Sequence, residues 1–361
     1  SRLTLDGMDC ADPYVERLLE GFAFLAARIQ LKFDAEFPSF VQHLTEVVYP
    51  DFLSPVPAMA IAHLEPDMQD SALVNGVTIP RNTALRARLG ADAQTACQFR
   101  TAHDVQLWPL RIAGVSFEAH EPTLPRGVRL SQTAGGAVRI RLDVVGDPSF
   151  DKLAVDELNF FVSGEDRIAS RLYEHLIANS LDVVVLPQGR NSDPIRLGPG
   201  ALRVDGFGDS KALLPVPKQS FRAYRLLREY AAFPARFLFF RMRGLREAFR
   251  ACKVKQVEIV ITLSKADPEL ERFVDAGSLT LFATPIVNLF PKTADRIFLD
   301  FKTPDFHVVA DRTRPMDFEV HSVQRVIGHG ANMQSEIEIH PLYASPDRAA
   351  ADTRGNMFHT L

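Results

Sequence analysis

The sequence predicts an α+β protein, with N-terminal helices followed by mainly antiparallel β domains that contain a β-α-β insertion. Three observations lead to this fold class. Apolar residues recur at helical spacing through the first 50 residues, alternate with polar residues in short runs from residue 58 onwards, and are separated there by glycine, proline and aspartate. A chain of 361 residues is long enough for two or three domains. We place them at residues 1–55, 56–215 and 216–361.

The first predicted domain consists of helices. Asp12 can cap a helix and Pro13 suits its first turn, so a helix is expected over residues 13–31. Pro38 then opens or kinks a second helix, which ends at Tyr49-Pro50. The first helix is apolar over a wide arc, so we expect it to be covered on more than one side. Its expected inward residues are Val15, Leu18, Leu19, Phe22, Leu25, Ala26 and Ile29.

The second predicted domain is mainly β. Runs with a period of two predict antiparallel strands, because alternate side chains of a strand point to opposite faces. The run 138–144 shows this clearly, since its four apolar residues fall on one face. A strand, a helix and a strand at 158–162, 167–179 and 181–186 form the β-α-β element. The remaining strands are predicted at 59–64, 77–79, 98–100 and 106–112.

The third predicted domain follows a loop over residues 187–219 that is rich in glycine, proline, aspartate and serine. It opens with a predicted helix over 221–230, in which apolar and basic residues alternate at helical spacing. Strands are predicted after that helix at 236–241, 257–263, 279–282, 297–299 and 318–323.

Basic charge is concentrated in residues 211–255. The whole chain has a net charge of −4, but this segment holds twelve basic residues and two acidic ones, so it carries +10 and the remainder −14. Three interpretations remain open: a solvated face with intramolecular ion pairs, a surface for a protein partner, and a nucleic-acid site that combines phosphate contacts with stacking on the interleaved aromatic residues. In the predicted helix the arginines share one face, opposite Tyr224, Leu227 and Tyr230. We therefore assign the arginines to solvent and these three residues to the core.

The composition favours packed contacts between proteins. Of the 41 basic residues 32 are arginine, and the chain contains 26 phenylalanines. Both side chains suit contacts that exclude water. A genome that favours arginine codons, together with an ordinary core, is the alternative explanation. No run approaches the roughly 18 apolar residues of a membrane-spanning helix, and residues 1–12 lack an export signal, so we predict a cytoplasmic protein without membrane insertion.

The sequence lacks the usual motifs for catalysis, cofactors and metals. Serine-hydrolase, zinc-protease and nucleotide-loop signatures are missing, and Gly206-Phe207-Gly208 lacks the third glycine of a dinucleotide fingerprint. The three cysteines and ten histidines show no ligand spacing. His103-Asp104 would suit a base and its orienting group, but no nucleophile can be assigned to them. We predict no enzyme and no cofactor, and keep as an alternative a carbohydrate-active β-sandwich enzyme with two carboxylates about 5 to 10 Å apart.

Four blocks of sequence, in order, resemble the TssF family, also called VasA or ImpG, which provides a wedge subunit of the type VI secretion baseplate. Together they extend over about 300 residues. They are DCADPYVERLLEGFAFL at 9–25 with Phe37-Pro38 and Tyr49-Pro50, FRTAHDV at 99–105 with LWPL at 107–110, YRLL at 224–227 with FP at 233–234 and FLFF at 237–240, and PIVNLF at 285–290 with DRTRP at 311–315.

The resemblance implies a structural subunit rather than an enzyme. In that family two TssF copies and one TssG, joined by TssK and TssE, form wedges that ring the VgrG spike and dock the contractile sheath. The resemblance also implies a fold similar to wedge proteins of contractile phage baseplates, a cytoplasmic location with recruitment to the inner-membrane complex, and no nucleic-acid partner. It further implies that this chain is an N-terminal and central piece of a longer protein.

Two sets of residues are predicted to contact partners. Phe22, Leu25 and Ile29 are expected to contribute to a helical bundle with TssG, with burial inside the chain itself as the alternative. Arg241, Arg243 and Arg246 form the second set, at a place where this sequence is more basic than the family it resembles.

Overall fold

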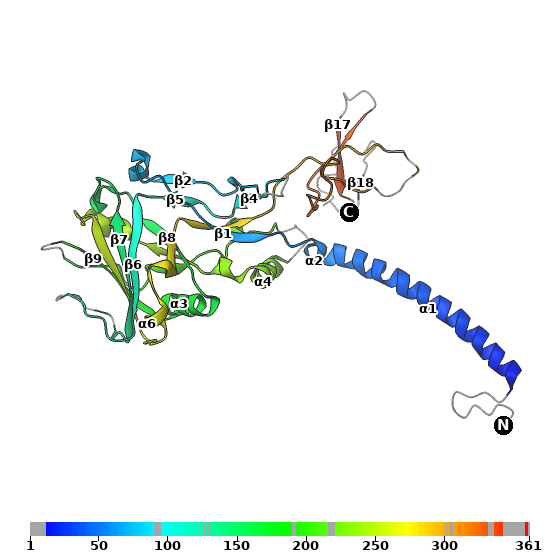
Figure 1. Cartoon of the computed structure of the whole chain (residues 1–361), viewed down its shortest axis with the longest axis horizontal. Coiled ribbons are helices and arrows are strands. Elements are labelled where there is room, and N and C mark those ends of the chain that lie inside the picture. The colour runs from blue at the N-terminus through cyan, green and yellow to red at the C-terminus, as the bar shows by residue number, and fades with distance from the viewer. Residues whose placement is uncertain are drawn as a thin grey trace. The chain divides into compact units, whose positions relative to one another are not determined.

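The computed structural model describes residues 12–89, 95–125, 128, 130, 132–189, 193–215, 221–300, 302, 306–330, 336–341 and 358–359. Contacts divide the chain into two units. One contains Ser1–Pro55 with Val216–Tyr224, and the other contains Val56–Pro215 with Arg225–Leu361. The N-terminal helix and the antiparallel sheets confirm the predicted α+β class (Figure 1).

The first unit consists mainly of one long helix, α1 (Pro13–Val48), followed by the short helix α2 (Pro50–Leu53). The Asp12 side chain accepts a hydrogen bond from the amide of Tyr14 at 2.9 Å, which caps α1 as the sequence predicts. The prediction of two separate helices is wrong, because α1 continues through Pro38. A proline removes only one amide donor, and the helical spacing of apolar residues continues past it.

Aromatic residues cluster where α1 and α2 meet. The ring of Tyr49 lies 4.7 Å from that of Tyr224 and 5.9 Å from that of Phe52. Tyr224 in turn packs edge-on against Phe221 at 5.5 Å. These ring contacts connect residues 221–224 with the first unit.

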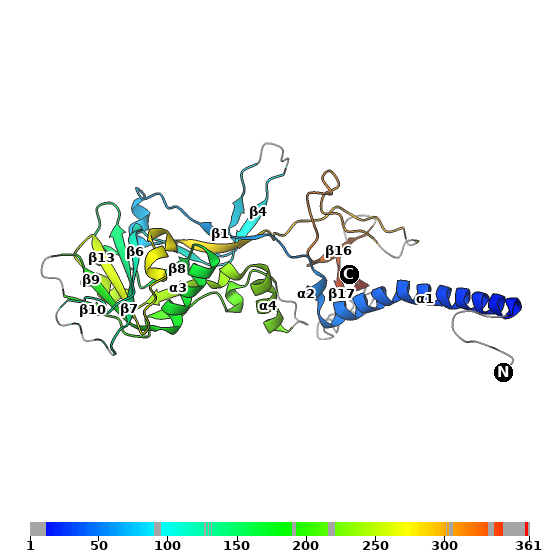
Figure 2. The same ribbon diagram turned by 60° about the horizontal axis from the view of Figure 1, so that its bottom comes forward.

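Two antiparallel sheets form the centre of the second unit (Figure 2). One has the strand order β10-β9-β13-β7-β6, and the other has the order β11-β12-β8-β14. In the central strand β13, Ile259 pairs with Ile140 of β7 on one side and with Val185 of β9 on the other. The strands are β6 (Leu110–Glu118), β7 (Gly136–Val144), β8 (Glu157–Val162), β9 (Ser180–Pro187), β10 (Ile195–Arg196), β11 (Leu202–Val204), β12 (Phe239–Arg243), β13 (Gln256–Leu263) and β14 (Leu279–Leu281).

The main core lies in this unit and combines both sheets with helix α3 (Asp166–Ala178). Ile168, Leu172 and Leu176 of α3 pack there, and Phe160 and Phe240 stack across paired strands with ring centres 5.1 Å apart. The predicted strand, helix and strand are confirmed as β8, α3 and β9. The two strands belong to different sheets, so α3 connects the sheets rather than two neighbours in one sheet.

Smaller elements complete the described chain. Three further sheets have the orders β1-β15-β4-β3, β2-β5 and β16-β17-β18. Their strands are β1 (Met59–His63), β2 (Val77–Ile79), β3 (Ala84–Arg86), β4 (Gln98–Thr101), β5 (Val105–Leu107), β15 (Ala283–Val287), β16 (Val326–His329), β17 (Glu336–Pro341) and β18 (Phe358–His359). The remaining helices are α4 (Arg222–Ala232), α5 (Leu245–Arg250) and α6 (Leu270–Phe273), with 3-10 turns η1 (Ser71–Asn75), η2 (Phe150–Lys152), η3 (Asp209–Lys211), η4 (Pro234–Phe237) and η5 (Ala276–Ser278).

Several strand predictions are wrong in detail. The run 236–241 starts as the turn η4, and β12 begins only at Phe239. The run 106–112 is divided into β5 and β6 at Trp108-Pro109, because a proline has no amide for the ladder. The predicted strands at 297–299 and 318–323 have irregular backbone, since neither pairs with another segment of the described chain.

The predicted domain boundary between residues 215 and 216 stays a prediction, and the two main sheets extend across it. Strands β12, β13 and β14 follow that point in the sequence. They pair with β8, β7 and β9, which precede it. Strands from both predicted domains therefore share one core.

Candidate functional site

Helix α1 presents a long exposed apolar face. Phe22, Leu25 and Ile29, which the sequence nominates for a partner, are 71%, 59% and 63% exposed. Further apolar residues continue this face at helical spacing, and they are exposed as well. They are Leu18, Leu19, Phe33, Phe37, Phe40 and Leu44. An apolar strip of this length on one helix face is typical of a surface that packs against other helices.

A second, smaller apolar patch lies on the opposite side of α1. Phe24 follows Phe22 by two residues, which turns it about 200° around the helix axis, and Leu31 lies two turns further on the same side. Both side chains are exposed. Charged residues flank them, among them Arg17 and Glu20, which are 3.6 Å apart. Sequence reasoning did not single out Phe24 and Leu31, although their spacing of seven residues was the available signal.

Part of the basic segment 211–255 is neutralised inside the protein. Glu229 Oε2 lies 3.1 Å from Arg225 and also contacts Arg236, and Glu229 Oε1 accepts the amides of Leu213 and Leu214 at 3.0 Å each. The side chains of all three charged residues are buried. The Glu229 carboxylate therefore contacts two guanidinium groups and holds the loop that precedes α4, and Arg225 pairs in addition with Asp209 at 3.1 Å.

This network changes the predicted orientation of α4. Arg225 and Glu229 face inwards, whereas Tyr224, Leu227 and Tyr230 are exposed. Assigning Arg225 to solvent and the three other residues to the core was therefore wrong, whereas Arg222 is exposed as predicted. The physical reason is that a buried carboxylate compensates the buried cations, so side-chain polarity alone does not identify the buried face.

The second predicted partner set lies along β12 and α5. Arg241 is held at 3.1 Å by Glu157 and at 3.2 Å by Asp205, and Arg243 lies 3.5 Å from Glu157. Arg243 and Arg246 are exposed. Their contact with a partner stays a prediction. The internal pairs of this segment favour its interpretation as an ion-paired surface over a nucleic-acid site.

His103 is buried beside the charged network. Burial and the positive charge of Lys211 lower the pKa of His103 from 6.5 to about 3, although Asp205 acts in the opposite direction. Its ring packs edge-on against Phe239 at 5.3 Å. Asp104 Oδ1 instead accepts the amide of Arg81 at 2.7 Å. The structure thus places His103 in the core, without the arrangement of a base and its orienting group.

Replacing His103 with leucine is expected to weaken the pH dependence of stability. The unfolded chain binds a proton at this histidine below pH 6.5 and the folded chain only near pH 3, so stability falls as the pH decreases through this range. The slope contributed by one proton is at most about 1.4 kcal/mol per pH unit. Urea unfolding between pH 7 and pH 4 measures it.

The control for that experiment is Phe239→Leu, which alters the ring against His103 without removing a titrating group. It should shift the free energy of unfolding by a similar amount at every pH. A His103→Leu curve parallel to that of the unaltered protein would contradict the prediction.

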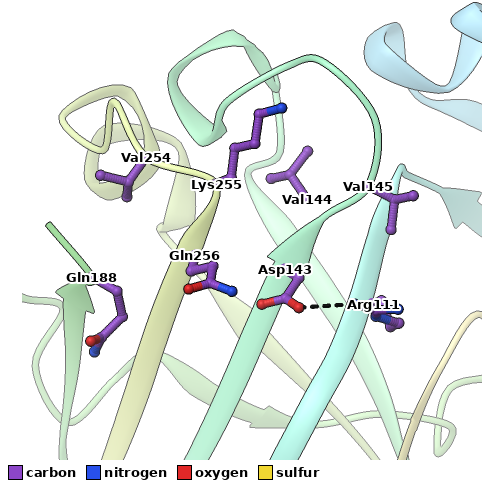
Figure 3. A pocket seen from close by; sticks show the side chains of 8 residues that line it. All are labelled: Arg111, Asp143, Val144, Val145, Gln188, Val254, Lys255 and Gln256. Carbon is purple, nitrogen blue, oxygen red and sulfur yellow. Dashed lines mark hydrogen bonds and ion pairs between the residues drawn. The ribbon is translucent and has the colours of Figure 1, made fainter.

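Two shallow hollows lie at one end of the five-stranded sheet. The first has a volume of about 470 Å³, and in it Asp143 points towards Arg111 at 3.1 Å (Figure 3). The second has a volume of about 440 Å³ and contains the pair Arg139–Glu258 at 3.0 Å. The lining of each hollow holds a single carboxylate, already paired with an arginine. Neither matches the two carboxylates of the carbohydrate-active alternative.

Among the described residues, no three histidine, cysteine, aspartate or glutamate side chains come together as a metal site. In the same part of the chain, no helix combines the length and apolar character needed to cross a membrane.

A 36-residue helix with exposed apolar faces, followed by antiparallel sheets, is typical of a subunit of a larger assembly. Comparison with known families specifies which one. The family model described as "Type VI secretion system, TssF" matches residues 1–361. The chain belongs to the TssF family of type VI secretion systems.

Two similar proteins extend this result. The chain is 46% identical over 349 residues to "Type VI secretion system component TssF1" of Pseudomonas aeruginosa, which covers 96% of this chain and 56% of the relative. The chain thus spans just over half the length of that relative. It is also similar in fold to a chain in the cryo-electron microscopy structure of the type VI secretion system TssK-TssF-TssG baseplate subcomplex. That match has a TM-score of 0.71 and 23% identity, and covers 90% of this chain and 58% of the other.

Proposed function

We propose that this chain is a structural, non-enzymatic subunit of the type VI secretion baseplate, in which α1 joins TssG and a second copy of the chain in a helical bundle. Membership of the TssF family supports the proposal, and so does the fold shared with a chain of the TssK-TssF-TssG subcomplex. The observation that carries it is α1, whose apolar residues are exposed along most of its length.

The energetics favour a partner on the broad face of α1. Burying one leucine or phenylalanine side chain contributes about 1.5 to 3 kcal/mol, and side chains such as Phe22 and Leu25 are exposed in the chain alone. A helix of TssG packed along this face would bury the strip at helical spacing. The patch of Phe24 and Leu31 faces the other way, which suits a second neighbour such as the other copy.

Further parts of the proposal follow from the family resemblance. The subunit would act in the cytoplasm and be recruited to the inner-membrane complex as part of the baseplate, together with TssK, TssE, the VgrG spike and the sheath. Of the second predicted set, Arg243 and Arg246 are exposed and would contact a protein partner, whereas Arg241 is engaged by Glu157 and Asp205.

Leu25→Asp is expected to weaken binding to TssG at least tenfold, which corresponds to about 1.4 kcal/mol. The substitution places a carboxylate in the middle of the apolar strip, where binding would have to remove it from water. Co-purification and titration of the full chain with TssG measure the effect. The matched control is Ala35→Asp, which adds the same charge on the side of α1 that carries Phe24 and Leu31, away from the broad apolar face, and should bind TssG as the unaltered chain does.

Thermal unfolding of the same variants separates binding from folding. Leu25 is exposed in the chain alone, so its replacement should leave the unfolding temperature nearly unchanged. A folded Leu25→Asp chain with undiminished binding to TssG would refute the bundle. A large loss of stability would instead indicate that Leu25 is buried within the chain itself.

A further inference from the structure

The chain between Phe290 and Phe318 has irregular backbone where the structure describes it, but its two ends contact each other. The rings of these two residues lie 6.3 Å apart, edge to face. Lys292 Nζ lies 3.3 Å from Asp311 Oδ2. The two ends of the segment therefore lie close together and contact each other.

A second set of contacts joins the two sides of this segment further along, at Asp295 and Arg312. Asp295 donates its amide to the carbonyl of Val309 at 2.9 Å, and Asp295 Oδ2 accepts the amide of Arg312 at 2.6 Å. The Arg312 guanidinium donates to the carbonyl of Arg296 at 2.9 Å. These hydrogen bonds involve main-chain atoms, and they fix the position of the chain as far as Arg296.

Three apolar residues follow directly after these contacts. Ile297, Phe298 and Leu299 are 39%, 82% and 49% exposed. No described residue makes a hydrogen bond with their main chain. Isoleucine and phenylalanine favour strands, and unpaired main-chain groups beside exposed apolar side chains are what a strand presents before it pairs. This explains why the sequence predicts a strand at 297–299 that the chain alone does not form.

The residues on either side indicate what completes the strand. Arg296 and Asp300 flank the three apolar residues symmetrically, so the order is basic, three apolar, acidic. In an antiparallel pair of two identical segments centred on Phe298, Arg296 lies opposite Asp300 at both ends, and Ile297 lies opposite Leu299. We propose that residues 296–300 pair in this way with the same segment of a second copy of this chain, across a two-fold axis at Phe298.

Such a contact is small for a stable dimer. Stable interfaces bury about 1,200 to 2,000 Å², more than a pair of five-residue strands provides. The pair therefore adds to an assembly that already holds two copies close together, where the effective concentration is high. In this respect the inference rests on the proposed function, which supplies the second copy.

Single cysteines test the register. With Cys10 and Cys97 replaced by serine, Phe298→Cys should form a covalent dimer on oxidation, because residue 298 faces itself. Ile297→Cys is the matched control, since two copies of residue 297 would be about 8 Å apart, beyond the roughly 7 Å that a disulfide spans. We expect Phe298→Cys to cross-link at least tenfold faster, both in the full chain alone at high concentration and in its complex with TssG. Chains with Ile297→Cys should cross-link with chains that carry Leu299→Cys.

Charge reversal tests the pairing of the ends. In the Phe298→Cys background, Arg296→Asp places two carboxylates opposite each other at both ends and should slow cross-linking about fivefold or more. Adding Asp300→Arg restores opposite charges and should restore the rate. The hydrogen bond from Arg312 uses the main-chain carbonyl of Arg296, whereas Asp300→Arg also removes the oxygen that accepts the Lys302 amide at 3.0 Å.

Equal cross-linking rates for Phe298→Cys and Ile297→Cys, or no cross-linking in either preparation, would overturn the self-pairing. A cross-linking rate that stays slow after both charges are reversed would also overturn it. Binding of TssG by the same variants is measured in parallel. If TssG still binds while cross-linking fails, the self-pairing is wrong and the proposed function stands. If the unaltered chain does not bind TssG, the proposed function is refuted.

Discussion

Replacing Glu229 with glutamine is expected to lower the free energy of unfolding by about 3 to 5 kcal/mol, because it removes the carboxylate that contacts the buried Arg236 and leaves the buried Arg225 paired with Asp209 alone. Arg236 is already an unfavourable cation in this place, since burial and the charge of Arg225 lower its pKa to about 10. The amides of Leu213 and Leu214 keep an acceptor in the glutamine oxygen, so the loss reports mainly on charge. The midpoint of urea unfolding measures it.

Glu247→Gln is the matched control for this experiment. Glu247 is the other acidic residue of the basic segment, and it is exposed on α5. Its replacement should change the free energy of unfolding by no more than about 0.5 kcal/mol. Equal losses for the two variants would show that the buried network is not what stabilises this part of the protein.

Gly76→Ala is expected to lower the free energy of unfolding by about 2 to 5 kcal/mol. Gly76 has φ of +80°, which an alanine adopts at a cost of about 1 to 2 kcal/mol. A Cβ at this position would also lie 2.6 Å from Cη2 of the buried Trp108 indole. Because the core is close-packed, this overlap adds about 1 to 3 kcal/mol. Thermal or urea unfolding measures the total.

Gly198→Ala separates the two contributions. Gly198 has a similar φ of +83°, but a Cβ there would meet nothing within 4 Å. The Gly198→Ala variant should therefore lose only the free energy that comes from the unfavourable backbone conformation. If both alanine variants lose the same free energy, the contact with Trp108 has no energetic weight.

Local patterns in the sequence predict much of the fold. Asp12 and Pro13 mark the start of α1, and the alternation in 138–144 marks β7, because caps and side-chain periods depend only on nearby residues. The pairing of β13 with β7 and β9 could not be predicted in this way. Which strands meet depends on contacts between residues far apart in the chain, and a period of two contains no information about the partner.

The candidate site shows the same limit. The apolar spacing of Phe22, Leu25 and Ile29 indicates a helix face, but only the structure shows that the face is exposed. At α4 the pattern leads to a wrong prediction, because the charge of the buried Arg225 is compensated by a carboxylate four residues further along the same helix. Glu229 is one of only two acidic residues among twelve basic ones in its segment, and that isolation was the signal available for its role.

The strand order of the five-stranded sheet constrains when this protein can fold during its synthesis. Its central strand, β13, is made after the four strands on either side of it. Until the ribosome has released residue 263, the hairpin β6–β7 and the hairpin β9–β10 each expose an edge that β13 will later occupy. The nascent chain therefore passes through a stage with two open, apolar strand edges, and it depends on rapid insertion of β13, or on a chaperone, to avoid aggregation at that stage.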